Sequence, residues 1–329
     1  MSAQADPAAH RPDPRTAPRG KRVGVIGVGN MGLAMVERLC AGGAAVVVHD
    51  VLGERLALAA NLGADVAPDS ASVAGRSATV IVAVVDAAQT EAVLFGEHGV
   101  RRADPPPRTV LLCPTIAPGD VERLARGLEA LGIEALDAPM SGGPARAREG
   151  RMSLMVAGDD AVFERAAPLL HWMADPVFRV GRSPGDGART KLVNNLLAAA
   201  NLAAAAEALS LAEAAGLDPQ RTLEVIEHSS GQSWIGSERA RRWLAARAAG
   251  LDARSMPPTA HAALLAKDSA LALDLARALA LVVPIGDAAA AAFATACREG
   301  DRQCDDAVLF ERAREAALAR LTARRSSPD

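Results

Sequence analysis

A side chain that can transfer a proton and one that can orient its neighbours by hydrogen bonds lie four residues apart in an apolar stretch of the chain. Lys191 and Asn195 belong to a long run rich in Ala and Leu that opens at Gly185. If this run is helical, the two side chains share one face and lie one turn apart. A desolvated Lys can release its proton and act as an acid or a base, whereas an Asn amide does not titrate and orients its neighbours by hydrogen bonds.

The choice of Lys at position 191 is informative in itself. The chain contains 36 Lys plus Arg residues, and only Lys21, Lys191 and Lys267 are lysines. Arg keeps its proton at any working pH, so an amine retained inside an apolar helix favours a catalytic acid or base. The alternative is an ordinary surface Lys near the start of a helix.

Two further short motifs have the chemistry of binding sites. Ser141-Gly142-Gly143 is a Gly-rich turn whose consecutive N–H groups suit a carboxylate. The alternative is a structural turn. Lys267-Asp268 lies in an apolar helical stretch, and the scarcity of Lys favours a functional role for Lys267. The alternative there is a charge on a helix surface with Asp268 as its solvated neighbour.

A Gly-rich loop near the N-terminus predicts a dinucleotide site. An apolar strand at 22–26 runs into G-x-G-x-x-G, a helical stretch follows, and Asp50 ends the next strand, 18 residues after the last glycine. In this context the loop and the helix N-terminus hold a pyrophosphate, and the acid accepts the ribose hydroxyls. Asp50 would repel a 2′-phosphate, so NAD is predicted rather than NADP, although Arg55 lies close in sequence. The predicted cofactor-binding residues of this segment are Gly27, Gly29, Asn30, Met31, Gly32 and Asp50.

The elements that must position these residues form two domains. Short apolar strands alternate with helical stretches up to about residue 181, which predicts an α/β fold with a doubly wound, Rossmann-type parallel sheet. Asp86, Thr115 and Ser141 follow strands directly, where ligands bind such sheets. After Gly185 the pattern is helical throughout, which predicts an all-α C-terminal domain. The predicted segments are a disordered tail at 1–20, a dinucleotide-binding domain at 21–184 and a helical substrate and oligomerisation domain at 185–329 that begins with a long linking helix.

Composition excludes several classes of function. A net charge of -3 gives no electrostatic basis for binding nucleic acid or an anionic membrane. The four cysteines are scattered and the six histidines form no ligand pair, so no metal site is predicted. Free thiols and a polar N-terminal segment without a signal-peptide core indicate a cytoplasmic protein, and no apolar run reaches membrane-spanning length once the polar residues of the Ala-rich helices are counted. Large aromatics are mostly buried, so Trp234 is predicted to lie in the core. The alternative is that Trp234 caps the substrate pocket.

These motifs, in this order, resemble the β-hydroxyacid dehydrogenase family, which includes 3-hydroxyisobutyrate dehydrogenase, tartronate semialdehyde reductase and L-threonate dehydrogenase. The resemblance runs from Val23 to about Glu311. The residues that carry it are Gly27-Val-Gly-Asn-Met-Gly32, Asp137-Ala-Pro-Met-Ser-Gly-Gly143, Gly185-Asp-Gly187 with Lys191 and Asn194-Asn195, and Lys267-Asp268.

The resemblance implies a role for each motif. Lys191 would be the catalytic residue, and Asn195 with Ser141, Gly142 and Gly143 would contact the substrate. The cofactor contacts would extend to Val85, Asp86, Thr90, Thr115 and Lys267. The family also implies a homodimer or homotetramer formed through the helical domain. Imine reductases share the fold but lack the family's catalytic Lys, so Lys191 disfavours that activity.

Within the family, the segments 85–97, 205–208, 216–219 and 229–234 are most similar to the L-threonate dehydrogenases. This likeness implies NAD-dependent oxidation of a small 3-hydroxy acid, with L-threonate going to a 2-oxo-tetronate-type or 3-oxo acid. Two alternatives stay open within the class, namely a 3-hydroxyisobutyrate dehydrogenase and a tartronate or succinic semialdehyde reductase. An alternative from another class is a non-catalytic NAD-binding module.

Overall fold

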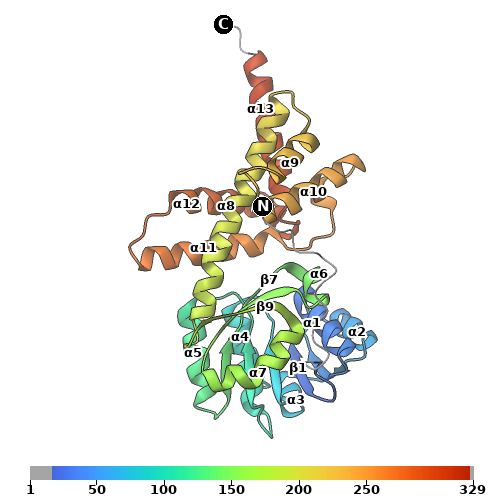
Figure 1. Ribbon diagram of the computed structural model, residues 1–329, viewed down its shortest axis with the longest axis vertical. Coiled ribbons are helices and arrows are strands. Elements are labelled where there is room, and N and C mark those ends of the chain that lie inside the picture. Colours follow the sequence, from blue (N-terminus) through green and yellow to red (C-terminus); the bar gives the residue numbers. More distant parts are fainter. Residues whose placement is uncertain (1–16, 327–329) are drawn as a thin grey trace. The chain divides into compact units, whose positions relative to one another are not determined.

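The described residues form two compact units, and the chain passes from one to the other within one long helix. The computed structural model describes residues 17–326, and the chain divides between Lys191 and Leu192. Most of the predicted disordered tail, residues 1–16, lies outside the described part. The first unit is an α/β unit and the second is helical, and Figure 1 labels their elements.

The first unit is built around one sheet. Its strands are β1 Arg22–Ile26, β2 Ala45–His49, β3 Asp65–Val66, β4 Thr79–Val82, β5 Thr109–Leu112, β6 Glu134–Asp137, β7 Met140–Ser141, β8 Met152–Ala157 and β9 Ala174–Gly181. Its helices are α1 Asn30–Ala41, α2 Gly53–Asn61, α3 Ser70–Gly75, α4 Ala87–Phe95, α5 Pro118–Glu129, α6 Gly143–Arg148 and α7 Asp160–Met173, with a 3₁₀ turn at Val100–Arg102.

The sheet has the doubly wound topology that the sequence predicts. Its order is β3-β2-β1-β4-β5-β6-β8-β7, and β9 pairs with β8. The strands from β3 to β6 are parallel, which confirms the predicted fold class. The β8 strand runs antiparallel to β6 and β7, a reversal that the sequence did not predict. The segment between β6 and β8 contains β7 and the short α6, and β7 itself pairs antiparallel with β8.

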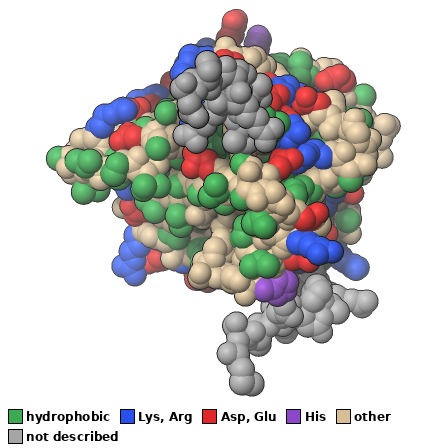
Figure 2. Space-filling model, turned by 90° about the horizontal axis from the view of Figure 1, so that it is seen from above, with side chains coloured by type: hydrophobic (Ala, Val, Ile, Leu, Met, Phe, Trp, Pro, Cys, Tyr) green, Lys and Arg blue, Asp and Glu red, His purple; other side chains and the backbone are tan. Residues whose placement is uncertain are grey.

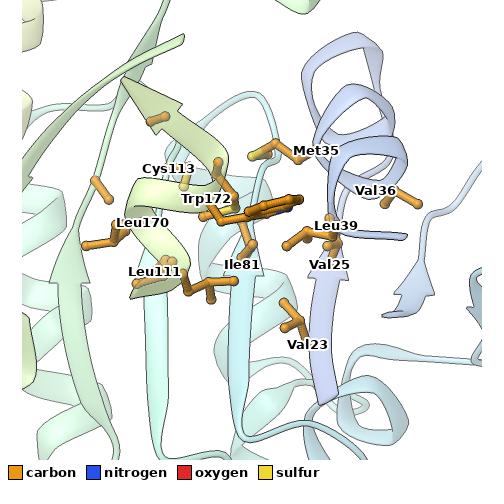
Figure 3. Packing of buried hydrophobic residues seen from close by; sticks show 14 of the residues in the cluster. Val23, Val25, Met35, Val36, Leu39, Ile81, Leu111, Cys113, Leu170 and Trp172 are labelled. Carbon is orange, nitrogen blue, oxygen red and sulfur yellow. The ribbon is translucent and has the colours of Figure 1, made fainter. Parts of the chain in front are cut away.

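Both faces of this sheet are buried, which explains the near-continuous apolar strands. Alternate residues of each strand enter different clusters, because successive side chains point to opposite faces. Ile81 and Leu111 pack with α1 and α7 on one face, where Trp172 lies beside Val25 and Leu39 (Figure 3). Val80, Val82, Val110 and Leu112 pack on the other face with residues of α4 and α5.

The second unit consists of helices around its own core. They are the remainder of α8 Asp186–Ala214, then α9 Pro219–Glu227, α10 Trp234–Ala248, α11 Ala262–Ala278, α12 Pro284–Arg298 and α13 Val308–Ser326, with 3₁₀ turns at Ala253–Ser255 and Asp301–Gln303. Trp243 stacks on Phe310 at the centre, with ring centroids 5.3 Å apart. Trp234 is 51% exposed at the start of α10, so the prediction that it lies in the core is wrong. Trp243, further along the same helix, is the tryptophan of α10 that is buried in the core.

The α8 helix has the length and apolarity of a membrane span, with a mean hydropathy of 1.3 in its most apolar window. Among the described residues it alone meets that test. Leu202, Ala206 and Leu209 of this helix are buried in the core of the second unit. Val193, Leu197 and Leu211 of the same helix are exposed at 66%, 62% and 71%, so only part of the apolar surface of α8 belongs to that core.

Candidate active site

The Gly-rich loop between β1 and α1 is shaped to admit a phosphate. A Cβ added at Gly32 would lie 2.0 Å from the carbonyl oxygen of Gly27, so the loop and the first turn of α1 close on each other only with glycine. A Cβ at Gly29 would meet nothing within 4 Å. The α1 helix has no side-chain cap, so its first N–H groups stay available to an anion. These observations fit the pyrophosphate of a dinucleotide.

Asp50 lies at the carboxyl end of β2 and is tied to this loop. Its Oδ2 atom accepts a hydrogen bond of 2.6 Å from the N–H of Val28, and its Oδ1 atom accepts one of 2.9 Å from the N–H of Leu52. The Arg55 guanidinium donates to Oδ1 of Asn30 at 3.3 Å. Arg55 is half-buried in the structure, beside the first residue of α1. If a 2′-phosphate bound at this edge of the sheet, the Asp50 carboxylate would repel it and the Arg55 guanidinium would attract it.

Replacement of Asp50 by Asn is expected to shift cofactor preference toward NADP. Asn keeps an acceptor for the Val28 N–H but removes the charge that repels a 2′-phosphate, while Arg55 remains. A change of about 1.4 kcal/mol is tenfold, so the ratio of kcat/KM for NADP to that for NAD should rise about tenfold or more. Steady-state kinetics with both cofactors measure this ratio. Asp65→Asn, an exposed acid paired with Arg76, is the matched control, and an unchanged ratio in Asp50→Asn would show that this carboxylate does not face the ribose.

The segment after β4 is organised by a helix cap. Asp86 accepts the N–H of Gln89 at 2.8 Å, and Oε1 of Gln89 accepts the N–H of Val85 at 3.1 Å, so the two side chains cap α4 reciprocally. The Thr90 hydroxyl is buried and donates to the Asp86 carbonyl at 2.7 Å. Val85 is 50% exposed and its side chain remains available to a ligand. Asp86 and Thr90 thus have structural uses in addition to their predicted cofactor contacts.

The first turn of α8 is anchored by Asp137, at the carboxyl end of β6. Its Oδ2 atom accepts the N–H groups of Gly185 and Ala188 at 2.8 and 2.9 Å. A Cβ at Gly187 would lie 2.7 Å from the Met155 carbonyl oxygen and 2.9 Å from the Asp137 carboxyl, so this close approach requires glycine. Burial raises the pKa of Asp137 to about 6, although the helix N–H groups act in the opposite direction. The Gly185-Asp-Gly187 motif thereby fixes the start of the helix that carries Lys191.

Lys191 and Asn195 are both buried in the same helix. Their exposures are 7% and 6%, and the helical spacing places them on one face about 5–6 Å apart at Cβ. The Nδ2 atom of Asn195 donates to Oδ2 of Asp268 at 2.6 Å, and Nζ of Lys267 donates to Oδ1 of the same carboxylate at 2.7 Å. Asp268 is 6% exposed, which rules out the solvated neighbour of the sequence interpretation.

The Ser141–Gly143 turn lies between β7 and α6. Gly142 and Gly143 have φ angles of 118° and 75°, a conformation that favours glycine. Ser141 pairs with Ser153 of β8, so the antiparallel strand pair holds the turn at one end. The turn follows Asp137 by a few residues, which connects it along the chain to the residue that anchors α8.

The structure distributes the predicted site residues over both units. The glycine loop, Asp50, the 85–90 segment and Thr115 follow β1, β2, β4 and β5, so they lie along the carboxyl ends of neighbouring parallel strands. Ser141–Gly143 and Lys191 also belong to the first unit, whereas Asn195 and Lys267 belong to the second. Asn195 and Lys267 meet at Asp268. Sequence reasoning named neither Asp137 nor Asp268 as a site residue, and the only signal for either was its place inside a motif.

A cavity of about 760 Å³ in the first unit lies elsewhere. It is bordered by α5, α7 and the turn before α8, near the amino end of β6, and none of the predicted site residues lines it.

The described residues contain no group of three His, Cys, Asp or Glu side chains suited to a metal ion. Burial raises the pKa of each of the four cysteine thiols, which disfavours a thiolate.

Each of the two units matches a known protein-family model. Residues 22–181 match the NAD-binding domain of 6-phosphogluconate dehydrogenase. Residues 185–312 match the NAD-binding domain of NADP-dependent 3-hydroxyisobutyrate dehydrogenase. The two matches together cover most of the described chain.

Individual relatives match along most of their length. The chain is 35% identical to an L-threonate dehydrogenase of Cupriavidus necator over 88% of this chain and 95% of that protein. It is also 35% identical to a 2-hydroxy-3-oxopropionate reductase of Escherichia coli over 88% of this chain and 96% of that protein. A crystal structure of a 3-hydroxyisobutyrate dehydrogenase from Salmonella typhimurium superposes with a TM-score of 0.79 at 31% identity, covering 88% of this chain and 99% of that one.

Proposed function

Because this chain belongs to the β-hydroxyacid dehydrogenase family, with its NAD-dependent dehydrogenases of CH–OH groups, we propose that it oxidises L-threonate with NAD. The observation that carries the proposal is the buried Lys191 one helical turn before the buried Asn195. An amine and an amide at this spacing can take a proton from a hydroxyl and hold that hydroxyl in place.

Each group of the proposed site has a distinct task. The N–H groups of the Ser141–Gly143 turn bind the substrate carboxylate. Lys191 accepts the proton of the reacting hydroxyl, directly or through water, while Asn195 orients that hydroxyl. The cofactor, held by the Gly27–Gly32 loop, Asp50 and the 85–90 segment, with Thr115 and Lys267, supplies the hydride acceptor when bound. Charge neutrality is kept because one proton and one hydride leave the substrate together.

Three sources support L-threonate as the substrate. The relatives named above include an L-threonate dehydrogenase, and the segments 85–97, 205–208, 216–219 and 229–234 resemble such enzymes. A polar polyhydroxy acid also suits a site built from an ammonium, an amide and backbone N–H groups. The second candidate is the reduction of a small semialdehyde acid, which is favoured by the equal identity to a 2-hydroxy-3-oxopropionate reductase.

The test is a panel of substrates followed by the absorbance of NADH. L-threonate is offered beside D-threonate, L- and D-glycerate, 3-hydroxyisobutyrate and 4-hydroxybutyrate, each with NAD and with NADP. We expect L-threonate with NAD to give the highest kcat/KM. Turnover of a different acid would replace the substrate but keep the chemistry, and NAD binding without turnover on any acid would favour a non-catalytic NAD-binding module.

We also propose that two copies of the chain associate through the helical unit. Leu281 and Val282, in the turn between α11 and α12, and Ile285, in the first turn of α12, are exposed at 59%, 87% and 72%. Figure 2 shows hydrophobic side chains gathered at the left edge of the view, the side on which Figure 1 shows this turn. Clusters of exposed apolar side chains mark association surfaces. Analytical ultracentrifugation at micromolar concentration is the measurement, and a monomer would contradict this proposal.

The cytoplasm is the proposed location. All four cysteines are free in the described residues, and their protonated thiols persist in a reducing compartment. Fractionation of the producing cells, followed by immunoblotting, would contradict this location if the protein were recovered outside the cytoplasm.

A further inference from the structure

A single buried carboxylate joins the two predicted site residues of the second unit. Asp268, in α11, is 6% exposed. Its Oδ2 atom accepts from Nδ2 of Asn195 at 2.6 Å, and its Oδ1 atom accepts from Nζ of Lys267 at 2.7 Å. One oxygen therefore binds the residue assigned to the substrate, and the other binds the residue assigned to the cofactor.

The chemistry of these contacts determines the direction of the Asn195 amide. A carboxylate that is ion-paired with Lys267 offers acceptors only, so Asn195 must present its NH₂ group to Asp268 rather than its oxygen. On the other side, Nδ2 of Asn194 donates to Oδ1 of Asn195 at 3.0 Å. Donor and acceptor are thus fixed from opposite sides, and the reversed amide would lose both hydrogen bonds.

We propose that Asp268 is a positioning residue that orients the Asn195 amide for the substrate. This inference rests on the proposed function, because it takes Asn195 as a substrate contact. With one N–H held by Asp268, the second N–H of the amide is left to donate to a substrate oxygen. Asn195 then donates a hydrogen bond to the substrate in a fixed direction, because Asp268 and Asn194 hold its amide.

Other buried acids of this unit have a different use. Asp305 accepts the backbone N–H of Thr259 at 2.7 Å and pairs with Arg242, and Asp306 pairs with the buried Arg239. Those pairs tie the 299–308 segment to its neighbours. The partners of Asp268, by contrast, are two of the residues that the family resemblance assigns to substrate and cofactor, and this is what assigns it a role in function.

A double-mutant cycle tests the proposal. Asp268→Ala should lower kcat/KM for the hydroxy acid about 100-fold, since a misplaced contact of about 1 Å has that effect. Asn195→Ala removes the amide on which Asp268 acts. In the Asn195→Ala background, Asp268→Ala should change kcat/KM for the acid less than threefold, because residues that act as a unit are not additive. Asp274→Ala, an exposed acid of the same helix paired with Arg277, is the matched control.

The outcomes separate positioning from a general effect on folding. Retention of the full 100-fold loss in the Asn195→Ala background would overturn the proposal. NAD affinity and the melting temperature are measured for each variant, and Asp268→Asn, of similar volume, enters the same cycle if the Ala variant does not fold. If neither variant folds, Asp268 is a structural residue and the proposal is wrong.

A structural readout keeps this proposal distinct from the proposed function. If the wild type oxidises none of the acids in the panel, the proposed function fails on that result alone. Crystal structures of the wild type and Asp268→Ala then decide the positioning role. We expect the Asn195 amide to adopt a new rotamer or direction while α8 stays in place, and an unchanged amide would refute the inference.

Discussion

Replacement of Lys191 by Ala should lower kcat by about 100- to 10,000-fold, the range that general acid–base catalysis supplies. The side chain is 7% exposed and lies one helical turn from Asn195, where an amine can exchange a proton with the substrate hydroxyl. The affinity for NAD should stay close to that of the wild type, because the glycine loop and Asp50 are untouched. Steady-state kinetics and a fluorescence titration with NAD measure the two quantities.

Lys191→Arg separates proton transfer from charge. Arg keeps a positive charge at the same position but holds its proton at any working pH. We therefore expect Lys191→Arg to be almost as inactive as the Ala variant. Lys21→Ala, at an exposed lysine just before β1, is the control for loss of an amine elsewhere. Near-normal activity of Lys191→Arg would show that Lys191 does not transfer the proton.

Gly32→Ala should nearly abolish use of the cofactor. The added Cβ would lie 2.0 Å from the Gly27 carbonyl oxygen, and both atoms belong to backbone that no side-chain rotation can move. Relief of this contact to an ordinary separation requires the loop to move by about 1 Å from the helix N-terminus, and a misplacement of that size costs about 100-fold. We expect kcat/KM for NAD to fall by that factor, as measured with saturating hydroxy acid.

A second glycine provides the control for this experiment. Gly53 stands in the first turn of α2, and a Cβ added there meets nothing within 4 Å. Gly53→Ala should bind NAD as the wild type does. Overpacking also costs about 1–3 kcal/mol of stability, so the melting temperature of Gly32→Ala is compared with that of the control. Wild-type affinity for NAD in a folded Gly32→Ala protein would contradict the assigned role of the loop.

Local patterns in the sequence were enough to predict much of the fold. The bounds of β1 agree with the apolar strand predicted at 22–26, since this element depends on a short stretch of chain. The glycine loop followed by Asp50 is also a local signal. Short elements such as β3, β7, α3 and α6 are harder to predict, because two to six residues carry too little periodicity to distinguish a strand or a helix from a loop.

Features that depend on contacts between distant residues were decided only by the tertiary structure. The antiparallel course of β8 and the exposure of Trp234 belong to this group, as does the contact of Arg55 with Asn30. The direction in which a strand pairs, and the burial of one side chain, follow from elements far away in sequence.

The chemistry of the site divides in the same way. The sequence by itself determined that a rare Lys and an Asn occupy one face of an apolar helix, because i and i+4 spacing is a property of any helix. Only the tertiary structure brought Asp137, 48 residues before Gly185, to the first turn of that helix, and Asp268, 73 residues after Asn195, to its amide. For these two carboxylates the sequence shows only their place inside a motif, because their hydrogen-bond partners are set by packing.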